Sequence, residues 1–437
     1  MSKLNRLMVL CIAALCSQHP YAQSQVVTSI EELFLLADEN STSIQAYRTG
    51  MKAADQTLKA TKAQRLPDIN TSVSASYLGD GRLWDRDFGY TTRIDMPHFG
   101  NNFAIEAQQV IYAGGAINSS IRLAELEQQL AELEWQKNRQ EIRFLLASYY
   151  LDLYKLNNQL QVLQKNLELT EQMIAHMEAC RREGTVLQND ITRYELQRET
   201  LKLQLAQVTD ARTILNHRLV TTLHLPEGTE ITPDTTLLEH QVQTLAEDDW
   251  QALAMQSHIG LRQAEAVVHI SEQKVQLERS ARLPQVALVA ADHLDGPITI
   301  EVPVLDNNFN YWYVGVGVKY SLSSLFKNGS KLKQARLNVR RAQESQRLAA
   351  EEVENVVQAG YTNFLTSFTD LRTQENSVRL ANQNYDVTSN RYRNEMALLT
   401  DLLDASNMKL SADLGLVNAR INVLYNYYKM KYLTHTL

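Results

Sequence analysis

The side chains best suited to catalysis or metal binding are spread along this chain without a recognisable grouping. There is no His-Glu-x-x-His, no Gly-x-Ser-x-Gly, no phosphate-binding loop and no cysteine cluster. The stretch YAGGAINSS (112–120) has a glycine pair but lacks the G-x-G-x-x-G spacing of a dinucleotide site. The histidines are scattered, among them His176, His217, His224, His240, His258 and His269. The sequence therefore predicts a protein that is not an enzyme and that holds no metal and no cofactor.

The N-terminus has the pattern of a secretory signal peptide over residues 1–22. Lys3 and Arg6 form a positive region, LMVLCIAALC follows as a short apolar stretch, and Ala22 offers a cleavage site. Two of the three cysteines lie in this segment, so only Cys180 remains after cleavage. We therefore expect an exported chain without an intrachain disulfide.

The composition narrows the class of protein further. No run of eighteen apolar residues follows the signal, so we expect no transmembrane helix. The net charge of −7 shows no basic bias, which argues against a nucleic-acid partner. Only 16 glycines and 8 prolines occur in 437 residues, which favours long uninterrupted helices.

The chain contains an internal duplication. Three segments of the first half recur in the same order in the second half, offset by 217, 214 and 211 residues, and their matching positions are Arg65 with Arg282, Gly115 with Gly329, and Asp190 with Asp401. We therefore predict two structural repeats, 23–240 and 241–437, each with a helix, two strands and two long helices.

Each repeat follows one plan. A first helix ends at Arg-Leu-Pro, because proline stops a helix at the preceding residue; it is broken near 39–43 in the first repeat and begins near Asp249 in the second. The long helices carry leucines at coiled-coil spacing, which predicts antiparallel coiled coils. The expected strands are 68–78, 102–112, 285–294 and 311–321, and the expected long helices are 116–183, 188–224, 330–394 and 398–433.

The four strands have the length that crosses a bilayer when a strand is tilted. In the last strand, one face has the aromatic residues Trp312 and Tyr320 at its ends, with valines between them. This is typical of a lipid-facing strand with an interfacial aromatic girdle. A single such strand would fit a half-buried strand of a soluble sheet better. Four of them, with a signal peptide and no membrane helix, favour the membrane.

Four strands cannot close a barrel. In lipid, open strand edges leave backbone groups unpaired, so only closed barrels span a membrane. The chain must then share one barrel with copies of itself. Two copies give eight strands and three give twelve, and the strands themselves leave both possible.

The chain resembles the TolC-like outer-membrane efflux channel family over residues 27–435. The Arg-Leu-Pro before each first strand, QVIYAGGAINSSIRLAE (109–125) and LLTDLLDA (398–405) carry the resemblance. It implies a membrane α+β fold: a homotrimer with a shared twelve-stranded β-barrel in outer-membrane lipid and a periplasmic α-helical barrel. It also implies a passive export duct of a Gram-negative bacterium that docks onto a periplasmic adaptor and an inner-membrane transporter. The junctions of barrel and helices would lie at Gly114, Gly115 and Gly329.

The resemblance also implies a gate at the periplasmic end of the helices. By position, Asp401 and Asp404 match acidic residues that face the pore, and Tyr392 and Asp190 match a pair that hydrogen-bonds between helices. The residues alone favour an ordinary solvated helix face, and with the family position the two interpretations are about equal. The chain departs from the family pattern at Ala397, in place of an arginine, and at Glu395, in place of a glycine. We therefore expect fewer links to hold the gate closed.

A rival interpretation from another class is a soluble periplasmic coiled-coil scaffold or adaptor. Its strands would form a small soluble sheet, and salt without detergent would extract it.

Overall fold

The computed structural model describes residues 25–234, 242, 244–301, 304–394 and 396–437. The expected signal peptide, Glu395 and the expected boundary between the repeats lie outside these residues. The chain divides into two compact units. The helical unit contains Met1–Arg48, Trp135–Ile259 and Ala350–Leu437, and the sheet unit contains Thr49–Glu134 and Gly260–Ala349.

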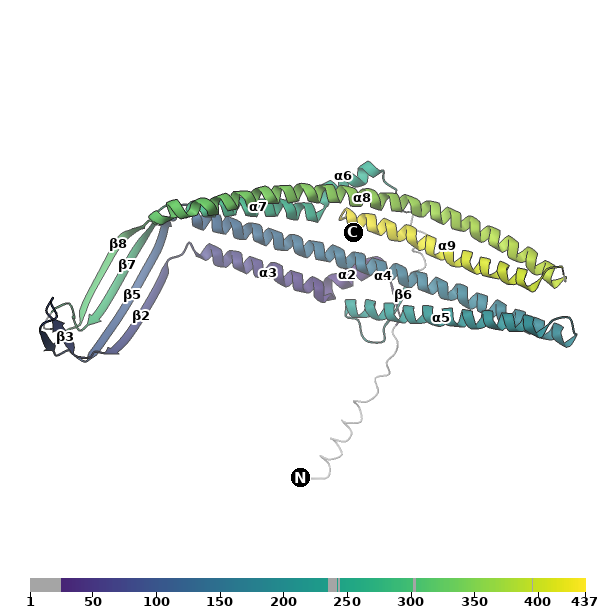
Figure 1. The fold of residues 1–437 in the computed structure, drawn as a ribbon, viewed down its shortest axis with the longest axis horizontal. Coiled ribbons are helices and arrows are strands. Elements are labelled where there is room, and N and C mark those ends of the chain that lie inside the picture. The colour runs from purple at the N-terminus through teal and green to yellow at the C-terminus, as the bar shows by residue number, and fades with distance from the viewer. Residues whose placement is uncertain (1–24, 235–241, 243, 302–303, 395) are drawn as a thin grey trace, which may run out of the picture. The chain divides into compact units, whose positions relative to one another are not determined.

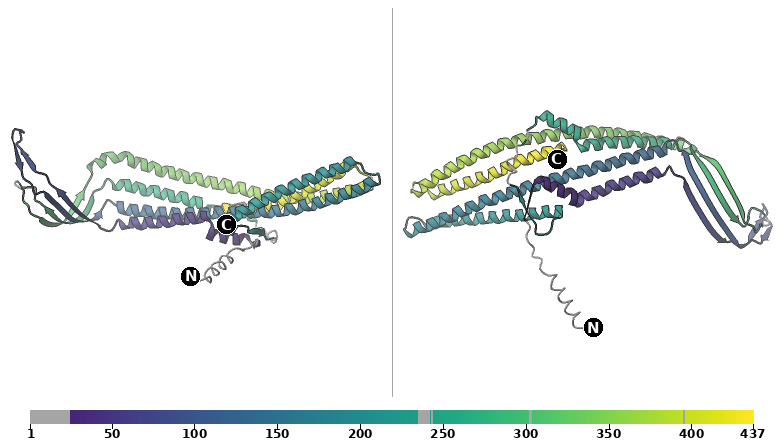
Figure 2. Two further views of the ribbon diagram at one scale, coloured as in Figure 1. Left: turned by 90° about the horizontal axis from the view of Figure 1, so that it is seen from below. Right: turned by 180° about the vertical axis from the view of Figure 1, so that it is seen from behind.

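The sheet unit is built on a four-stranded antiparallel sheet in the order β2-β5-β7-β8 (Figures 1 and 2). The strands are β2 (Asp68–Tyr77), β5 (Phe99–Tyr112), β7 (Gln285–Gly296) and β8 (Phe309–Lys319). All four predicted strands are therefore present. The loop between β2 and β5 also forms a hairpin that the sequence pattern did not indicate, β3 (Gly81–Trp84) with β4 (Thr91–Ile94).

Strand register aligns one largely apolar face across all four strands of the sheet. Ile69 pairs with Ala107, Ala107 with Ala290, and Ala290 with Val314. One residue along, Asn70 pairs with Glu106 on the opposite face. The apolar face is not covered by a core, since Val314 is 68% exposed. We call these the apolar face and the polar face of the sheet.

A helix leads into the first strand of each repeat. The helix α3 (Thr42–Ala63) precedes β2, and α7 (Ile259–Ser280) precedes β7. Both end just before Arg-Leu-Pro, as the proline predicts. Small apolar clusters hold the helices in pairs: Leu58 with Ile121 and Ala124, and Val275 with Leu332 and Ala335.

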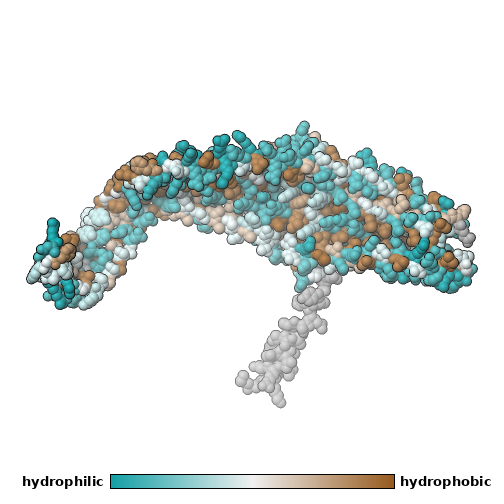
Figure 3. Space-filling model, viewed as in Figure 1, coloured by the Kyte–Doolittle hydropathy of each residue, from teal (hydrophilic) through white to brown (hydrophobic). Residues whose placement is uncertain are grey.

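The helical unit holds the long hairpins. The first is α4 (Ala116–Arg182) with α5 (Gln188–Leu223), and the second is α8 (Leu322–Arg393) with α9 (Leu399–Leu433); α4 and α8 begin in the sheet unit. The turns between their helices fall where the expected helix bounds placed them. Figure 3 shows hydrophilic and hydrophobic residues interleaved over the visible surface of the helices.

The core of the helical unit lies where α2 (Ile30–Asn40) packs against the long helices. Tyr150, Leu146 and Leu153 of α4 are buried there with Leu33 and Leu219. Beside this core, the parallel strands β1 (Gln25–Thr28) and β6 (Glu230–Pro233) pair, and α6 (Glu247–Ser257) precedes α7.

Two expectations about the helices were wrong. The helix α8 begins at Leu322, not at 330, so Gly329 lies inside the helix and does not mark a junction. Its φ is not positive, and the nearest heavy atom to an added Cβ would be the Arg282 guanidinium at 3.8 Å, so nothing there requires glycine. The joint of the second repeat is Tyr320–Ser321. The first helix of that repeat is also interrupted, at His258, where the backbone is extended.

Among the helices of the described residues, none is long and apolar enough to cross a membrane.

Candidate functional site

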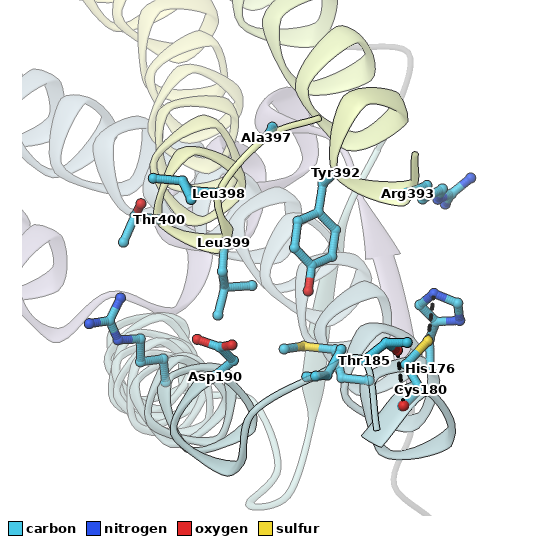
Figure 4. Close-up of a pocket in the computed structure, with 13 residues that line it drawn as sticks. His176, Cys180, Thr185, Asp190, Tyr392, Arg393, Ala397, Leu398, Leu399 and Thr400 are labelled. Atoms are coloured by element: carbon cyan, nitrogen blue, oxygen red, sulfur yellow. Dashed lines mark hydrogen bonds between the residues drawn. The ribbon is translucent and has the colours of Figure 1, made fainter. Parts of the chain in front are cut away.

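A pocket of about 530 Å³ lies between the turns of the two helical hairpins (Figure 4). Three sides of it come from α4, α5 and α8, and the fourth comes from the turn into α9. Its lining includes His176, Cys180, Asp190, Arg193, Tyr392, Arg393, Ala397 and Leu399. It therefore brings together Tyr392 and Asp190, the two residues expected to link the hairpins.

Tyr392 extends from α8 toward the α4–α5 hairpin, and Asp190 at the start of α5 faces the same space (Figure 4). Burial and the Asp190 carboxylate raise the pKa of the Tyr392 hydroxyl, so it stays protonated and able to donate at neutral pH. In the single chain as described, no hydrogen bond joins the two side chains. The pair is thus placed across one pocket without being linked.

The pocket rests on a small buried cluster that joins the two hairpins. Tyr194 of α5 is buried against Met177 of α4 and Leu402 of α9, and Tyr385 and Tyr392 of α8 pack against the same cluster. Burial raises the pKa of the Tyr194 hydroxyl strongly. This contact sets how the ends of the hairpins lie against each other.

Asp401 and Asp404 lie on one exposed face of α9, beside the pocket. Both aspartates are exposed, whereas Leu402 and Ala405, each one residue and about 100° around the helix from them, are buried. Both carboxylates therefore point away from the core of their own chain. Asp401 has a second, local role, because its Oδ2 accepts the backbone N–H of Leu398 at 3.1 Å.

The sequence pattern did not single out two features of this pocket. Arg193 and Arg393 add cationic groups to the lining of the pocket, although Ala397 occupies the position where the family pattern has arginine. The sequence did contain a signal for Arg393 as a lining residue, because it directly follows Tyr392. His176 and Cys180, four residues apart on α4, also meet here, with Nε2 and Sγ 3.6 Å apart.

The joint between β5 and α4 depends on Gly114. Its φ is +60°, and an added Cβ would lie 2.6 Å from Leu283 Cβ and 2.9 Å from the Ser280 carbonyl oxygen. Gly115 also has a positive φ, +86°, but open space surrounds it. Both lie between the end of β5 and the start of α4. Trp312 is exposed on the apolar face, and Tyr320 lies just beyond the end of β8.

A model of the outer membrane efflux protein family matches residues 33–223 and 250–430. This chain belongs to that family. A relative, the outer membrane efflux protein BepC of Brucella suis biovar 1 (strain 1330), is 20% identical over 93% of this chain and 85% of its own length. Family membership makes the chain an efflux channel of the Gram-negative outer membrane that extends into the periplasm. The family is not one of enzymes, and a soluble scaffold is not favoured.

Solved structures share the fold of this efflux protein. The outer membrane protein VceC from Vibrio cholerae superimposes with a TM-score of 0.77 at 16% identity, over 93% of this chain and 95% of that one. CusC superimposes with a TM-score of 0.80 at 12% identity, over 95% of each chain. The fold class expected from the sequence, long antiparallel helices with a sheet of membrane strands, is therefore confirmed.

Proposed function

We propose that three copies of this efflux protein form one passive export duct, with a shared twelve-stranded barrel in outer-membrane lipid and a periplasmic tube of helices. The observation that carries the proposal is the exposed apolar face that runs in register across all four strands. Such a face suits contact with lipid, and in lipid the strands must belong to a closed barrel.

The outer strands of the sheet explain why copies must associate. β2 and β8 each pair with one strand only in the four-stranded sheet, so each leaves one row of backbone N–H and C=O groups unpaired. In lipid each such group costs several kcal/mol. Pairing β8 of one copy with β2 of the next removes both edges without any new segment of chain.

The width needed by a duct favours three copies over two. Side chains fill the interior of an eight-stranded barrel, which leaves no passage for a solute. Twelve strands enclose a wider lumen, and the polar face of the sheet would line it. Trp312 and Tyr320 would then mark the two ends of the lipid-facing band, as an aromatic girdle does.

The carboxylates of Asp401 and Asp404 would ring the periplasmic opening. They are exposed on the face of α9 turned away from the core of the chain, which supports a position toward the pore. Rings of carboxylates select for cations. The pocket between the turns of the two hairpins is called the tip pocket. Tyr392 and Asp190 would close the opening when the two sides of the tip pocket approach and the Tyr392 hydroxyl donates to the Asp190 carboxylate.

The turns of the two hairpins are the surface for a periplasmic adaptor, which in turn joins an inner-membrane transporter. Leu187 and Leu398 precede α5 and α9 at matching positions of the two repeats, and they are 71% and 70% exposed. Met396 is exposed beside them. Exposed leucines at matching turns suit a partner that contacts both repeats in the same way. We place the boundary between the two repeats at 240/241.

Conductance tests the duct. Protein extracted from outer membranes with detergent should produce discrete conductance steps in a planar lipid bilayer. Extraction by salt alone, with no conductance from the detergent fraction, would favour the soluble scaffold.

A further inference from the structure

Four rings form a continuous stack on the polar face of the sheet. The Tyr311 ring lies 5.4 Å from Phe309 and 5.0 Å from His293, and His293 lies 6.2 Å from Tyr313 (centroid distances). The interplanar angles are 26°, 13° and 14°, so the rings are nearly parallel. We call these four residues the ring ladder. It lies at the end of β7 and β8 farther from the helices.

The ring ladder is open to solvent. Phe309, Tyr311 and Tyr313 are 53%, 37% and 47% exposed. Toward the helices, the same face of β8 continues with Gly315 and Gly317, which have no side chains to cover the rings. Stacked aromatic rings that no core covers offer flat surfaces for another ring.

Carboxylates flank the ring ladder. Glu106 Oε1 lies 3.9 Å from His293 Nε2, and Asp295 accepts from Asn102 and lies 3.5 Å from the Tyr311 hydroxyl. The lysine on this face of β8 is Lys319, at the opposite end of the strand. A cation over an aromatic face gains further stabilisation from the ring quadrupole. The chemistry of the patch thus combines stacking with attraction for positive charge.

We propose that the ring ladder is a transit binding site for planar aromatic cations on the wall of the export duct. The proposal rests on the duct itself, which makes the polar face the lumen wall. Stacking of a planar ring on one aromatic side chain is worth about 1–3 kcal/mol, so loss of both tyrosine rings should weaken binding about tenfold or more.

Ethidium is a suitable probe, because it is a planar aromatic cation whose binding would interrupt the ion current. Full-length protein would be reconstituted in a planar bilayer, and ethidium would be added on the side of the strands. We expect concentration-dependent blocks in the wild type. Tyr311→Ala/Tyr313→Ala should raise the blocking concentration about tenfold or more. The matched variant Tyr311→Phe/Tyr313→Phe keeps the rings and should retain the block.

The charge contribution needs its own variant. Glu106→Gln should weaken the block by ethidium severalfold. A neutral sugar should not block the wild type at the concentration at which ethidium does. Equal block by the sugar would overturn the assignment to aromatic cations. It would indicate that the rings bind solutes without regard to charge or aromatic character.

The outcomes separate the site from the duct. A wild type without conductance would overturn the duct and the ring ladder together. Normal conductance with an unchanged block in the alanine variant would overturn the ring ladder alone. If the double alanine variant does not conduct, Tyr313→Ala gives the same test, since that side chain has no hydrogen bond among the described residues. An unchanged block in Tyr313→Ala would then overturn the site.

Discussion

Asp401 caps its own helix: its carboxylate accepts the backbone N–H of Leu398 at 3.1 Å, while Asp404 on the same exposed face has no such contact among the described residues. An alanine at position 401 would therefore remove the proposed pore charge and a helix cap together. Asparagine keeps the capping oxygen and removes only the charge. This difference decides how the gate should be tested.

The first prediction concerns ion selectivity. Asp401→Asn/Asp404→Asn should lower the cation-over-anion permeability ratio and weaken block by multivalent cations, because the opening loses its carboxylates. Reversal potentials in a salt gradient measure the ratio. Asp210→Asn, on α5, is a control that removes a charge away from the tip. If the permeability ratio of the double variant equals that of the wild type, these aspartates do not line the pore.

The second prediction concerns closure. Tyr392→Phe removes only the hydroxyl that faces Asp190 across the tip pocket, and Asp190→Asn removes the charge that would hold it. Each should raise the conductance of the isolated channel. Tyr385→Phe is the control, because Tyr385 packs against the same cluster but does not line the pocket. A closed-state conductance equal to wild type in both variants would place closure elsewhere.

The third prediction separates two glycines, Gly114 and Gly329, that were both expected at junctions of barrel and helices. Gly114→Ala should destabilise the protein by about 1–3 kcal/mol, because φ is positive and the new Cβ would overlap Leu283. Gly329→Ala should be neutral or stabilise by about 0.5–1 kcal/mol, because alanine is the better helix former inside α8. Thermal unfolding followed by circular dichroism compares them. Equal midpoints would contradict this account of the joint.

The contrast between these glycines shows where sequence reasoning succeeded. The duplication placed every long helix and all four membrane strands, because period and proline position are local signals. It failed at Gly329, since matching a motif does not reveal backbone conformation. Leu322–Asn328 has no helix-breaking residue, and α8 simply starts earlier.

The site was recoverable only in part. Matching positions in the family singled out Asp190 and Tyr392 as a pair, and both line one pocket. The approach of Arg193 to the pocket depends on how the two hairpins pack, which no local pattern encodes. The contact of His176 with Cys180 is a pair four residues apart on α4, which helical spacing could have indicated. The ring ladder was similarly out of reach: the alternation of β8 placed Tyr311 and Tyr313 on one face, but their stacking with His293 depends on register with β7.

The fourth prediction concerns acid stability in the helical unit. The rings of His258 and His435 meet edge to face with centroids 4.4 Å apart. Burial, the neighbouring His258 and Lys137 lower the pKa of His435 to about 4 from its ordinary 6.5. Burial and Lys137 also lower the pKa of His258, against a smaller opposing effect of Glu352. Tyr432 completes the surroundings of His435.

The direction of this pH dependence follows from proton uptake on unfolding. Between about pH 6.5 and 4, the unfolded chain binds a proton at His435 that the folded chain does not, so the free energy of unfolding falls as pH falls through this window. His435→Gln should flatten the dependence in urea titrations across that range. His269→Gln, an exposed histidine, should leave it unchanged. The same slope in wild type and His435→Gln would show that this pair does not titrate with unfolding.

The copy number of the detergent-extracted particle tests the central claim most directly. Light scattering after size exclusion, corrected for bound detergent, gives the protein mass of the particle. The shared barrel predicts a mass of three mature chains, which remains constant on dilution. A mass of one or two chains would contradict the twelve-stranded duct.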